Sequence, residues 1–238
     1  MNLHRSVDGS APDLCSTRPL IARIGLPLVL GEVPASAPAE DERSASPPDP
    51  IVAAVGVSAP GHGDEELRLH LRTAMRQCLA AAFAVTRLPW TAGHQENRGD
   101  EILIGQMTHV PAEALMDPLA HHLNAALRRH NRLVSRLARL RLRMAVHAGP
   151  VTRDATGVAG PATSHLFGLL RSPLFKEALD ESGADLGLIV SDRLYQDATR
   201  CAGLVDPAAY RPVRLHSEET SSKAWIWLPP PPPRPASG

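Results

Sequence analysis

The segment GHQENRGDEILIGQM, residues 93–107, gives the clearest indication of the fold. It reads as two short strands joined by a tight turn at Arg98, Gly99 and Asp100, and glycine and aspartate are residues that turns favour. Helical patterns precede and follow the stretch. Two strands between two helices are therefore the unit from which the rest of the fold is predicted.

The helix before this hairpin is predicted over residues 65–85. Its apolar side chains recur every three or four positions, which places them on one helix face. They are Leu67, Leu71, Ala74 or Met75, Cys78 and Ala82. The helix after the hairpin is predicted over residues 118–133, where Asp117 is suited to the N-cap and Pro118 to the first helical position.

The segment RLRLRMAVHAG, residues 139–149, alternates between apolar and other residues, which predicts a strand with one buried face. Strands are also expected at IVAAVGV (51–57) and within DLGLIVSD (185–192). One helix follows Ser172, and a short helix capped by Ser191 or Asp192 runs through Ala198. A closing hairpin is expected over 211–228. The order β-α-β-β-α-β-α-β-α-β-β predicts an α+β domain with a ferredoxin-like split βαβ sheet and helices packed on one face.

The chain divides by composition into three parts. Residues 34–50 hold five prolines and four acids, so residues 1–50 are expected to form a disordered tail and linker. A single folded domain is expected over 51–228. Residues 229–238 form a proline-rich tail, whose Pro230-x-x-Pro233-Arg234 is compatible with a protein partner that binds polyproline II helices, or with a spacer.

Bulk composition excludes several classes of partner. The formal net charge is zero, so no overall basic field recruits nucleic acid or a membrane surface, and we expect neither. The three cysteines Cys15, Cys78 and Cys201 are too far apart for a zinc knuckle and indicate no disulfide framework. No apolar run is long enough to span a bilayer. These features together predict a cytoplasmic protein.

Two groups of charged residues have more than one interpretation. Asp100 either holds a divalent metal at the mouth of the turn or bonds the backbone two residues on. Arginines line one face of the 139–149 segment, with others nearby, and this group fits a phosphate, an acidic partner, or a solvated or dimer-lining face. The arginines are Arg128, Arg129, Arg132, Arg136, Arg139, Arg141 and Arg143.

The order of elements, with the segments NRGDEILI, LRMAVHAGPV and GVAGPATSHLFGLL, resembles a class III nucleotidyl (adenylate/guanylate) cyclase homology domain of a divergent actinobacterial branch. Such cyclases convert a nucleoside triphosphate to a 3′,5′-cyclic monophosphate. The resemblance implies two metal-binding carboxylates on separate strands, an arginine for the phosphates and an asparagine for the ribose. It also implies a lysine and an aspartate that read the purine, in a site between two subunits packed head to tail.

Of the family's two metal-binding carboxylate positions, this chain retains one. The second carboxylate falls on Asp100. The first falls on Gly56, which offers no ligand. Asp64, a few residues beyond the first strand, is a candidate replacement for it.

The nucleotide-binding positions of the family are all replaced. The base-reading lysine falls near His94 and the base-reading aspartate near Pro161. The asparagine and the arginine fall on Ser164 and Gly168. A transition-state arginine is worth ~3 kcal/mol or more, so each such loss points away from turnover.

The resemblance therefore predicts a catalytically inactive cyclase-like domain, dimeric, that serves as a regulatory or interaction module in signalling. The dimer is expected to be a head-to-tail homodimer or heterodimer, and no cofactor is required. One alternative is an atypical nucleotidyl cyclase that uses Asp100 and Asp64 with Mg²⁺ or Mn²⁺. The other is a nucleotide-sensing module without turnover.

Overall fold

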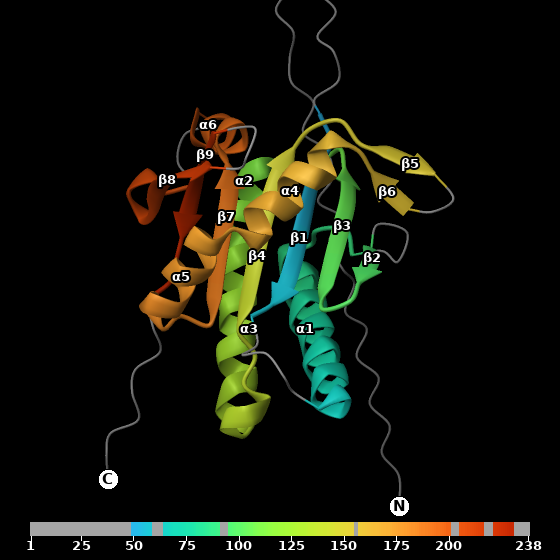
Figure 1. The fold of residues 1–238 in the computed structure, drawn as a ribbon, viewed down its shortest axis with the longest axis vertical. Helices are drawn as coiled ribbons and strands as arrows, with labels where there is room; N and C mark the ends of the chain where they lie inside the picture. Colours follow the sequence, from blue (N-terminus) through green and yellow to red (C-terminus); the bar gives the residue numbers. More distant parts are fainter. Residues whose placement is uncertain are drawn as a thin grey trace, which may run out of the picture. The chain divides into compact units, whose positions relative to one another are not determined.

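The computed structural model describes residues 49–58, 64–90, 95–154, 157–200, 205–216 and 221–230 (Figure 1). The strands are β1 (Ile51–Val57), β2 (Gln95–Arg98), β3 (Glu101–Met107), β4 (Leu142–Ala148), β5 (Thr152–Asp154), β6 (Gly157–Ala159), β7 (Leu186–Ser191), β8 (Tyr210–His216) and β9 (Ser221–Trp227). The helices are α1 (Glu65–Thr86), α2 (Ala112–Ala114), the π-turn η2 (Leu115–Leu119), α3 (Ala120–Leu133), the 3₁₀ turn η3 (Arg136–Ala138), α4 (Pro161–Arg171), α5 (Pro173–Ser182), α6 (Asp192–Arg200) and the 3₁₀ turn η4 (Pro207–Ala209).

Seven strands form the main sheet, in the order β2-β3-β1-β4-β7-β9-β8. The central strand β1 is antiparallel to both neighbours, and Ala54 lies opposite Leu103 of β3 and Ala145 of β4. β7 joins β4 in parallel, and β8 and β9 form the expected closing hairpin. The first four strands have the order of a split βαβ sheet, so the predicted α+β fold class is confirmed.

Helices cover both faces of this sheet rather than one. In Figure 1, α4 and α5 lie in front of the strands, with α1 and α3 behind them. Ile51, Ala53 and Val55 of β1 pack in the core with α1 and α3, whereas Val52 and Ala54 pack in a second core with α4 and α5. A strand that is apolar at every position buries both faces, which requires a helical layer on each.

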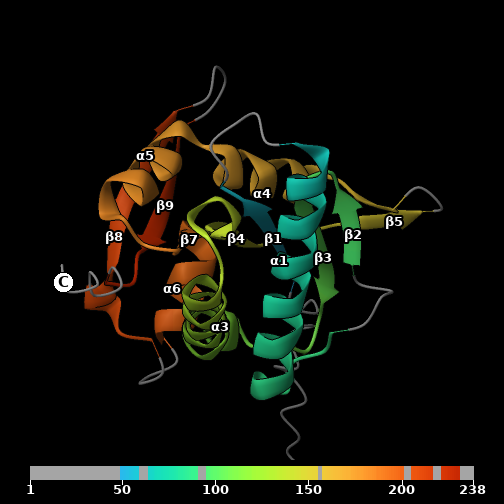
Figure 2. The same cartoon turned by 90° about the horizontal axis from the view of Figure 1, so that it is seen from below.

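The first two long helices lie side by side behind the sheet (Figure 2). The predicted core face of α1 is confirmed at four positions, because Leu71, Met75, Cys78 and Ala82 are all buried. The thiol of Cys78 lies within this face, and burial raises its pKa. It is therefore an unreactive core residue.

The start of the second long helix differs from the prediction. The helical segment begins at Ala112, so Asp117 is not its N-cap, and Pro118 lies inside the π-turn η2. Proline has no amide hydrogen and clashes with the preceding turn of a regular α-helix. A π-turn rearranges the hydrogen bonds at that point, which lets the chain continue into α3 without ending.

Four further elements, β5, β6, α4 and α5, lie between β4 and β7. The Gly-rich segment 149–160 contains the hairpin β5–β6. α4 then follows directly, starting at Gly160 (φ 126°) and Pro161. The sequence predicted one helix here, after Ser172, whereas the structure has two that meet at that residue.

The described helices include none that is long and apolar enough to cross a membrane. The tails expected at 1–50 and 229–238 lie almost wholly outside the described residues. The domain boundaries therefore stay a prediction.

Candidate functional site

The β2–β3 hairpin forms one side of the candidate site. The backbone of Arg98 on β2 lies opposite that of Glu101 on β3, and Gly99 and Asp100 form the turn between them. Gly99 has φ 68°, a conformation that residues with side chains adopt only at a cost. The tight turn predicted from the sequence is therefore confirmed, and it places two carboxylates next to each other in the chain.

The first of these carboxylates, Asp100, contacts helix α1. Its Oδ1 accepts a hydrogen bond from Nε of Arg72 at 2.8 Å. Both side chains are partly exposed, and Arg72 also lies 3.6 Å from the carboxylate of Glu65. The structure thus pairs Asp100 with an arginine that neither interpretation of the sequence anticipated.

The second carboxylate, Glu101, lies beside Gly56. Gly56 of β1 is opposite Glu101 on β3 and opposite Arg143 on β4. A Cβ atom built on Gly56 would lie 3.1 Å from Cγ and 3.7 Å from Oε1 of Glu101. The side chain of Glu101 therefore occupies the space into which a side chain at position 56 would point.

Arginine also holds Glu101. Arg171, the last residue of α4, donates from Nε to Oε1 at 3.0 Å and from Nη2 to Oε2 at 2.5 Å. This bidentate arrangement is the strongest geometry for an arginine–carboxylate pair. The Glu101 side chain is only 12% exposed, so the pair is shielded on the carboxylate side.

Asp64 lies immediately before α1. It is exposed, and its side chain makes no capping hydrogen bond to the helix. Among the described residues, no group of three or more His, Cys, Asp or Glu side chains is arranged to hold a metal ion. His94 lies outside the described residues.

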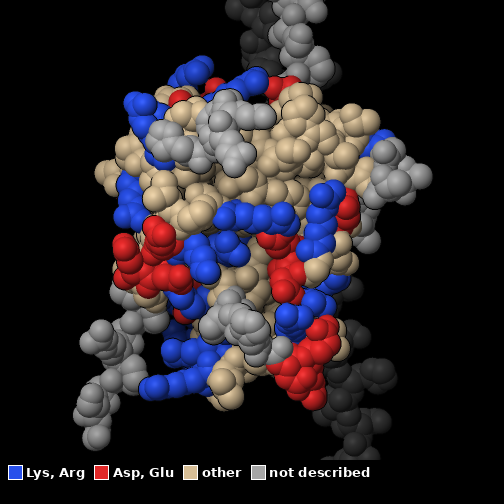
Figure 3. All heavy atoms as spheres, in the orientation of Figure 1, with Lys and Arg blue, Asp and Glu red and all other residues tan. Residues whose placement is uncertain are grey.

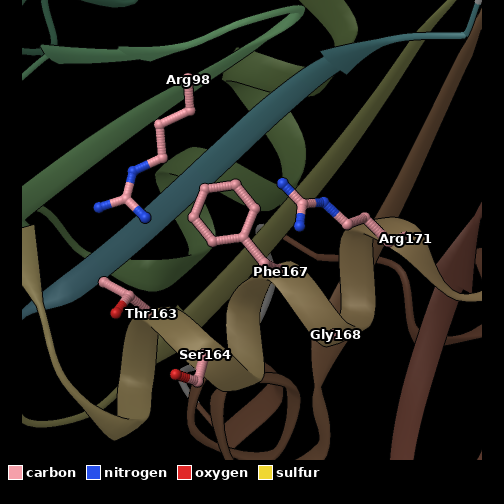
Figure 4. A pocket seen from close by; sticks show the side chains of 6 residues that line it. All are labelled: Arg98, Thr163, Ser164, Phe167, Gly168 and Arg171. Carbon is pink, nitrogen blue, oxygen red and sulfur yellow. The ribbon is translucent and has the colours of Figure 1, made fainter.

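Ser164 and Gly168 line a common hollow on α4 (Figure 4). The hollow has a volume of about 400 Å³, and its other lining residues are Arg98, Thr163, Phe167 and Arg171. A Cβ built on Gly168 would meet no atom within 4 Å, so this position is open. Pro161 does not line the hollow; it is the first residue of the same helix.

Two guanidinium groups flank the ring of Phe167 in this hollow. The Cζ atoms of Arg98 and Arg171 lie 5.2 and 4.9 Å from the ring centroid, within the range of cation–π attraction. Arg98 also donates to Oε1 of Glu96 at 2.9 Å and to the carbonyl of Val158 at 2.8 Å. These contacts tie the β5–β6 hairpin to β2 and fix one wall of the hollow.

A second hollow, of about 480 Å³, lies on the α1 side of the hairpin turn. It is lined by Leu69, Arg72, Thr73, Arg76, Asn97 and Gly99. The turn that carries Asp100 and Glu101 therefore stands between two arginine-bearing hollows. Sequence reasoning singled out Asp100, Ser164 and Gly168, but it did not assign roles to Arg72, Glu101 or Arg171.

Comparison with known proteins identifies the fold. No family model and no curated protein matches the sequence. A solved adenylate/guanylate cyclase/hydrolase from Silicibacter pomeroyi matches 75% of this chain and 96% of its own, with 15% identity and a TM-score of 0.51. The catalytic core of a rhodopsin-guanylyl cyclase in complex with ATPαS matches 76% and 96%, with 12% identity and a TM-score of 0.51. The chain has the class III nucleotidyl cyclase fold.

The likeness to these cyclase domains is one of fold, since the sequences are so divergent. A third cyclase domain is described as a non-canonical dimeric guanylyl cyclase domain from Blastocladiella emersonii; it matches 76% of this chain and 96% of its own, at 12% identity and a TM-score of 0.47. The recognition made from NRGDEILI and its companion segments agrees with the fold that the structure shows.

Proposed function

We propose that this cyclase-fold domain does not cyclise nucleotides and that it acts as a regulatory or interaction module in signalling. One observation carries the proposal: each carboxylate of the hairpin turn is already bound by an arginine of the same chain. Asp100 pairs with Arg72, and Glu101 pairs with Arg171. A guanidinium thus neutralises each acid that a metal ion would need.

The residues at this edge do not fit a two-metal site. Cyclisation by two divalent ions requires carboxylates from separate strands that converge on the ions. Gly56 supplies none, and its neighbours across the sheet are the paired Glu101 and the cationic Arg143. Among the described residues, a divalent ion at this edge would have to displace an arginine from each carboxylate.

The α4 side of the site supports the same proposal. Gly168 places no cation where a transferring phosphate needs one, and Arg171, one turn further on, is engaged with Glu101. Loss of a charge-stabilising group typically costs ~3 kcal/mol or more in the transition state, about a hundredfold or more in rate. These losses are not additive, but all of them lower the rate.

A turnover assay tests the proposal. The full chain is incubated with ATP, GTP, CTP or UTP and with Mg²⁺ or Mn²⁺, and cyclic nucleotide is measured by mass spectrometry. We expect none. Cyclic product that Asp100→Ala abolishes, and that the matched exposed-acid variant Asp197→Ala leaves unchanged, would contradict the proposal and establish the atypical cyclase instead.

Nucleotide sensing without turnover is a second candidate, favoured by the hollow on α4. Its two arginines flank an aromatic ring, an arrangement that suits an anionic ligand with a planar group. Gly168→Leu would place a side chain at the hollow, where a Cβ atom on residue 168 meets no atom within 4 Å. Calorimetry with a nucleotide panel is expected to show heat that this variant removes. No heat with any nucleotide rules sensing out.

We also propose that the domain works as a head-to-tail dimer in the cytoplasm, which the cyclase fold supports. Light scattering of the full chain over a range of concentrations tests the dimer, and a monomer throughout would contradict it. The proline-rich tail remains a candidate contact for a protein partner. Its residues 231–238 lie outside the described part of the chain.

A further inference from the structure

The end of α3 exposes two leucines to solvent. Leu133 is 81% exposed and Leu137 is 80% exposed, and no other large apolar side chain among the described residues is as open. They lie four residues apart, at the last residue of α3 and within η3. Side chains of this size lose favourable free energy when they stay in water.

Arginines surround these leucines. From residue 118 to residue 153 the sequence has no acidic residue and eight arginines, namely Arg128, Arg129, Arg132, Arg136, Arg139, Arg141, Arg143 and Arg153. Arg129, Arg132, Arg136 and Arg139 are exposed around the leucines. None of these four forms an ion pair with a described residue. Figure 3 shows basic side chains beside the lower end of α3.

Acidic residues nearby neutralise little of this charge. The first turn of α1 belongs to the same end of the domain, since α1 contacts η3. Its Glu65 lies 3.3 Å from Arg68 and 3.6 Å from Arg72, and so serves other arginines. Asp64 and Glu66 are exposed beside it. The four arginines against these two carboxylates still leave a local excess of positive charge.

We propose that this leucine–arginine tip, made of Leu133, Leu137, Arg129, Arg132, Arg136 and Arg139, docks on an anionic phospholipid surface. The two leucines enter the boundary between headgroups and acyl chains. The arginines bury their stems along the apolar layer and keep their guanidinium groups at the lipid phosphates. The zero net charge of the whole chain conceals this local asymmetry.

Shape favours a lipid surface over an acidic protein as the occupant. The tip is the end of a helix with its leucines almost fully open, and neither hollow described above is lined by its residues. An acidic protein would therefore need a concave surface of its own that fits the two protruding leucines. A bilayer interface deforms around an inserted side chain and needs no preformed groove. The proposal is independent of whether the cyclase-fold site binds nucleotide.

Vesicle flotation with the full chain tests the proposal. The vesicles are phosphatidylcholine alone, or phosphatidylcholine mixed with phosphatidylglycerol. We expect binding to the anionic vesicles that weakens in high salt, and much weaker binding to the neutral ones. Arg136→Gln/Arg139→Gln should lower the partition coefficient about twenty-five-fold, at roughly fivefold for each arginine near the surface. Leu133→Ser/Leu137→Ser should lower it at least about tenfold.

Matched variants control for charge and hydrophobicity elsewhere on the surface. Arg211→Gln/Arg214→Gln changes two exposed arginines of β8, and Leu69→Ser/Leu174→Ser changes two exposed leucines of other helices. Both should bind as the parent does. Absence of binding to anionic vesicles at low salt would overturn the proposal, and so would binding that the Leu133/Leu137 variant leaves intact. Retention on polyglutamate without vesicle binding would assign the tip to an acidic protein instead.

Discussion

At the scale of single residues, the site is governed by charge pairs inside the chain. Gly56 leaves a space on β1, the side chain of Glu101 fills it, and Arg171 then binds Glu101. Asp100 accepts a single hydrogen bond from Arg72, which belongs to the other helical layer. An edge that in a metal-dependent enzyme would be acidic is therefore close to neutral here.

The Glu101–Arg171 pair should contribute measurably to stability. Arg171→Met leaves a mostly shielded carboxylate without its bidentate partner, which should cost about 1–3 kcal/mol of unfolding free energy. Urea denaturation measures this cost, and combination with Glu101→Gln isolates the pair itself. Arg200→Met is the matched control, because Arg200 is 76% exposed and, among the described residues, forms an ion pair only with its helix neighbour Asp197. Equal losses in the two variants would contradict the assignment.

At the scale of elements, burial follows the helix period that the sequence displays. Leu71 faces the core from α1, whereas Leu69, two residues earlier, is 60% exposed on the same helix. Leu123 is fully buried on α3. The two helices pack on each other and on the sheet through these faces.

Truncation of the core leucines should therefore be costly. Leu71→Ala or Leu123→Ala removes packed atoms and leaves a cavity, for an expected loss of ~2–5 kcal/mol. Leu69→Ala, the control on the same helix, should change the unfolding free energy by about half a kilocalorie or less. Chemical denaturation of the three variants checks the helix phase. A loss below half a kilocalorie at both core sites would show that the assigned face is wrong.

A single asparagine joins α3 to the strand that follows it. Asn131 is buried, its Nδ2 donates to the carbonyl of Leu140 at 2.9 Å, and its Oδ1 accepts from the amide of Leu140 at 2.8 Å. The Asn131 amide thus makes to the backbone of Leu140, just before β4, the two hydrogen bonds that a neighbouring strand would make. This contact satisfies two buried backbone groups at once.

Asn131→Ala should leave both backbone groups of Leu140 without a partner. The expected cost is about 2–4 kcal/mol, from two unsatisfied buried groups at roughly 1–3 kcal/mol each with partial relaxation. Thermal and urea unfolding measure it. The control is Asn97→Ala, an exposed position of β2. If the two variants proved equally stable, the bridging role of Asn131 would be refuted.

At the scale of the whole molecule, a histidine pair joins three separate elements. Nδ1 of His147 on β4 lies 2.9 Å from Oγ of Ser191 at the end of β7, and its ring centroid is 4.6 Å from that of His165 on α4. Burial, with His165 and Arg193 beside it, lowers the pKa of His147 to about 4, against a partial opposing effect of Asp49. Burial also lowers the pKa of His165.

The stability of the fold should therefore decrease in mild acid. The folded state binds the His147 proton less well than the unfolded chain, whose histidine titrates near 6.5. The contribution is fully present above pH ~6.5 and is lost as the pH falls through about 4. On the order of 2 kcal/mol should be lost over that window, after allowance for partial solvent access.

Unfolding free energies measured between neutral pH and pH 4 test this expectation. His147→Asn should reduce the slope of the profile, because one of the two groups that titrate differently in the two states is gone and only His165 remains. His121→Asn, at an exposed position, should leave the slope as it is in the parent. A parent profile without any decline across the window would contradict the proposed linkage.

Local sequence patterns determined most of the elements and the fold class. The period of apolar residues predicted α1 and its core face. The turn residues predicted the β2–β3 hairpin, and the split βαβ order followed from the place of that hairpin between two helices. Two features were not predicted, because one depends on rearranged helix hydrogen bonds and the other on how the helices are distributed over the two faces of the sheet. Pro118 continues a helix through a π-turn, and the all-apolar β1 requires helices on both faces.

The same distinction between local sequence patterns and tertiary packing applies to the candidate site. The resemblance predicted a metal position at Asp100, a lost carboxylate at Gly56 and replaced positions at Ser164 and Gly168, because each is a property of one residue in a recognisable segment. That Glu101 fills the space beside Gly56, and that Arg72 and Arg171 bind the two acids, follows from the three-dimensional packing. Those partners are 28 and 70 residues apart in the chain. Strand register and helix packing alone bring them together, and no local pattern records either.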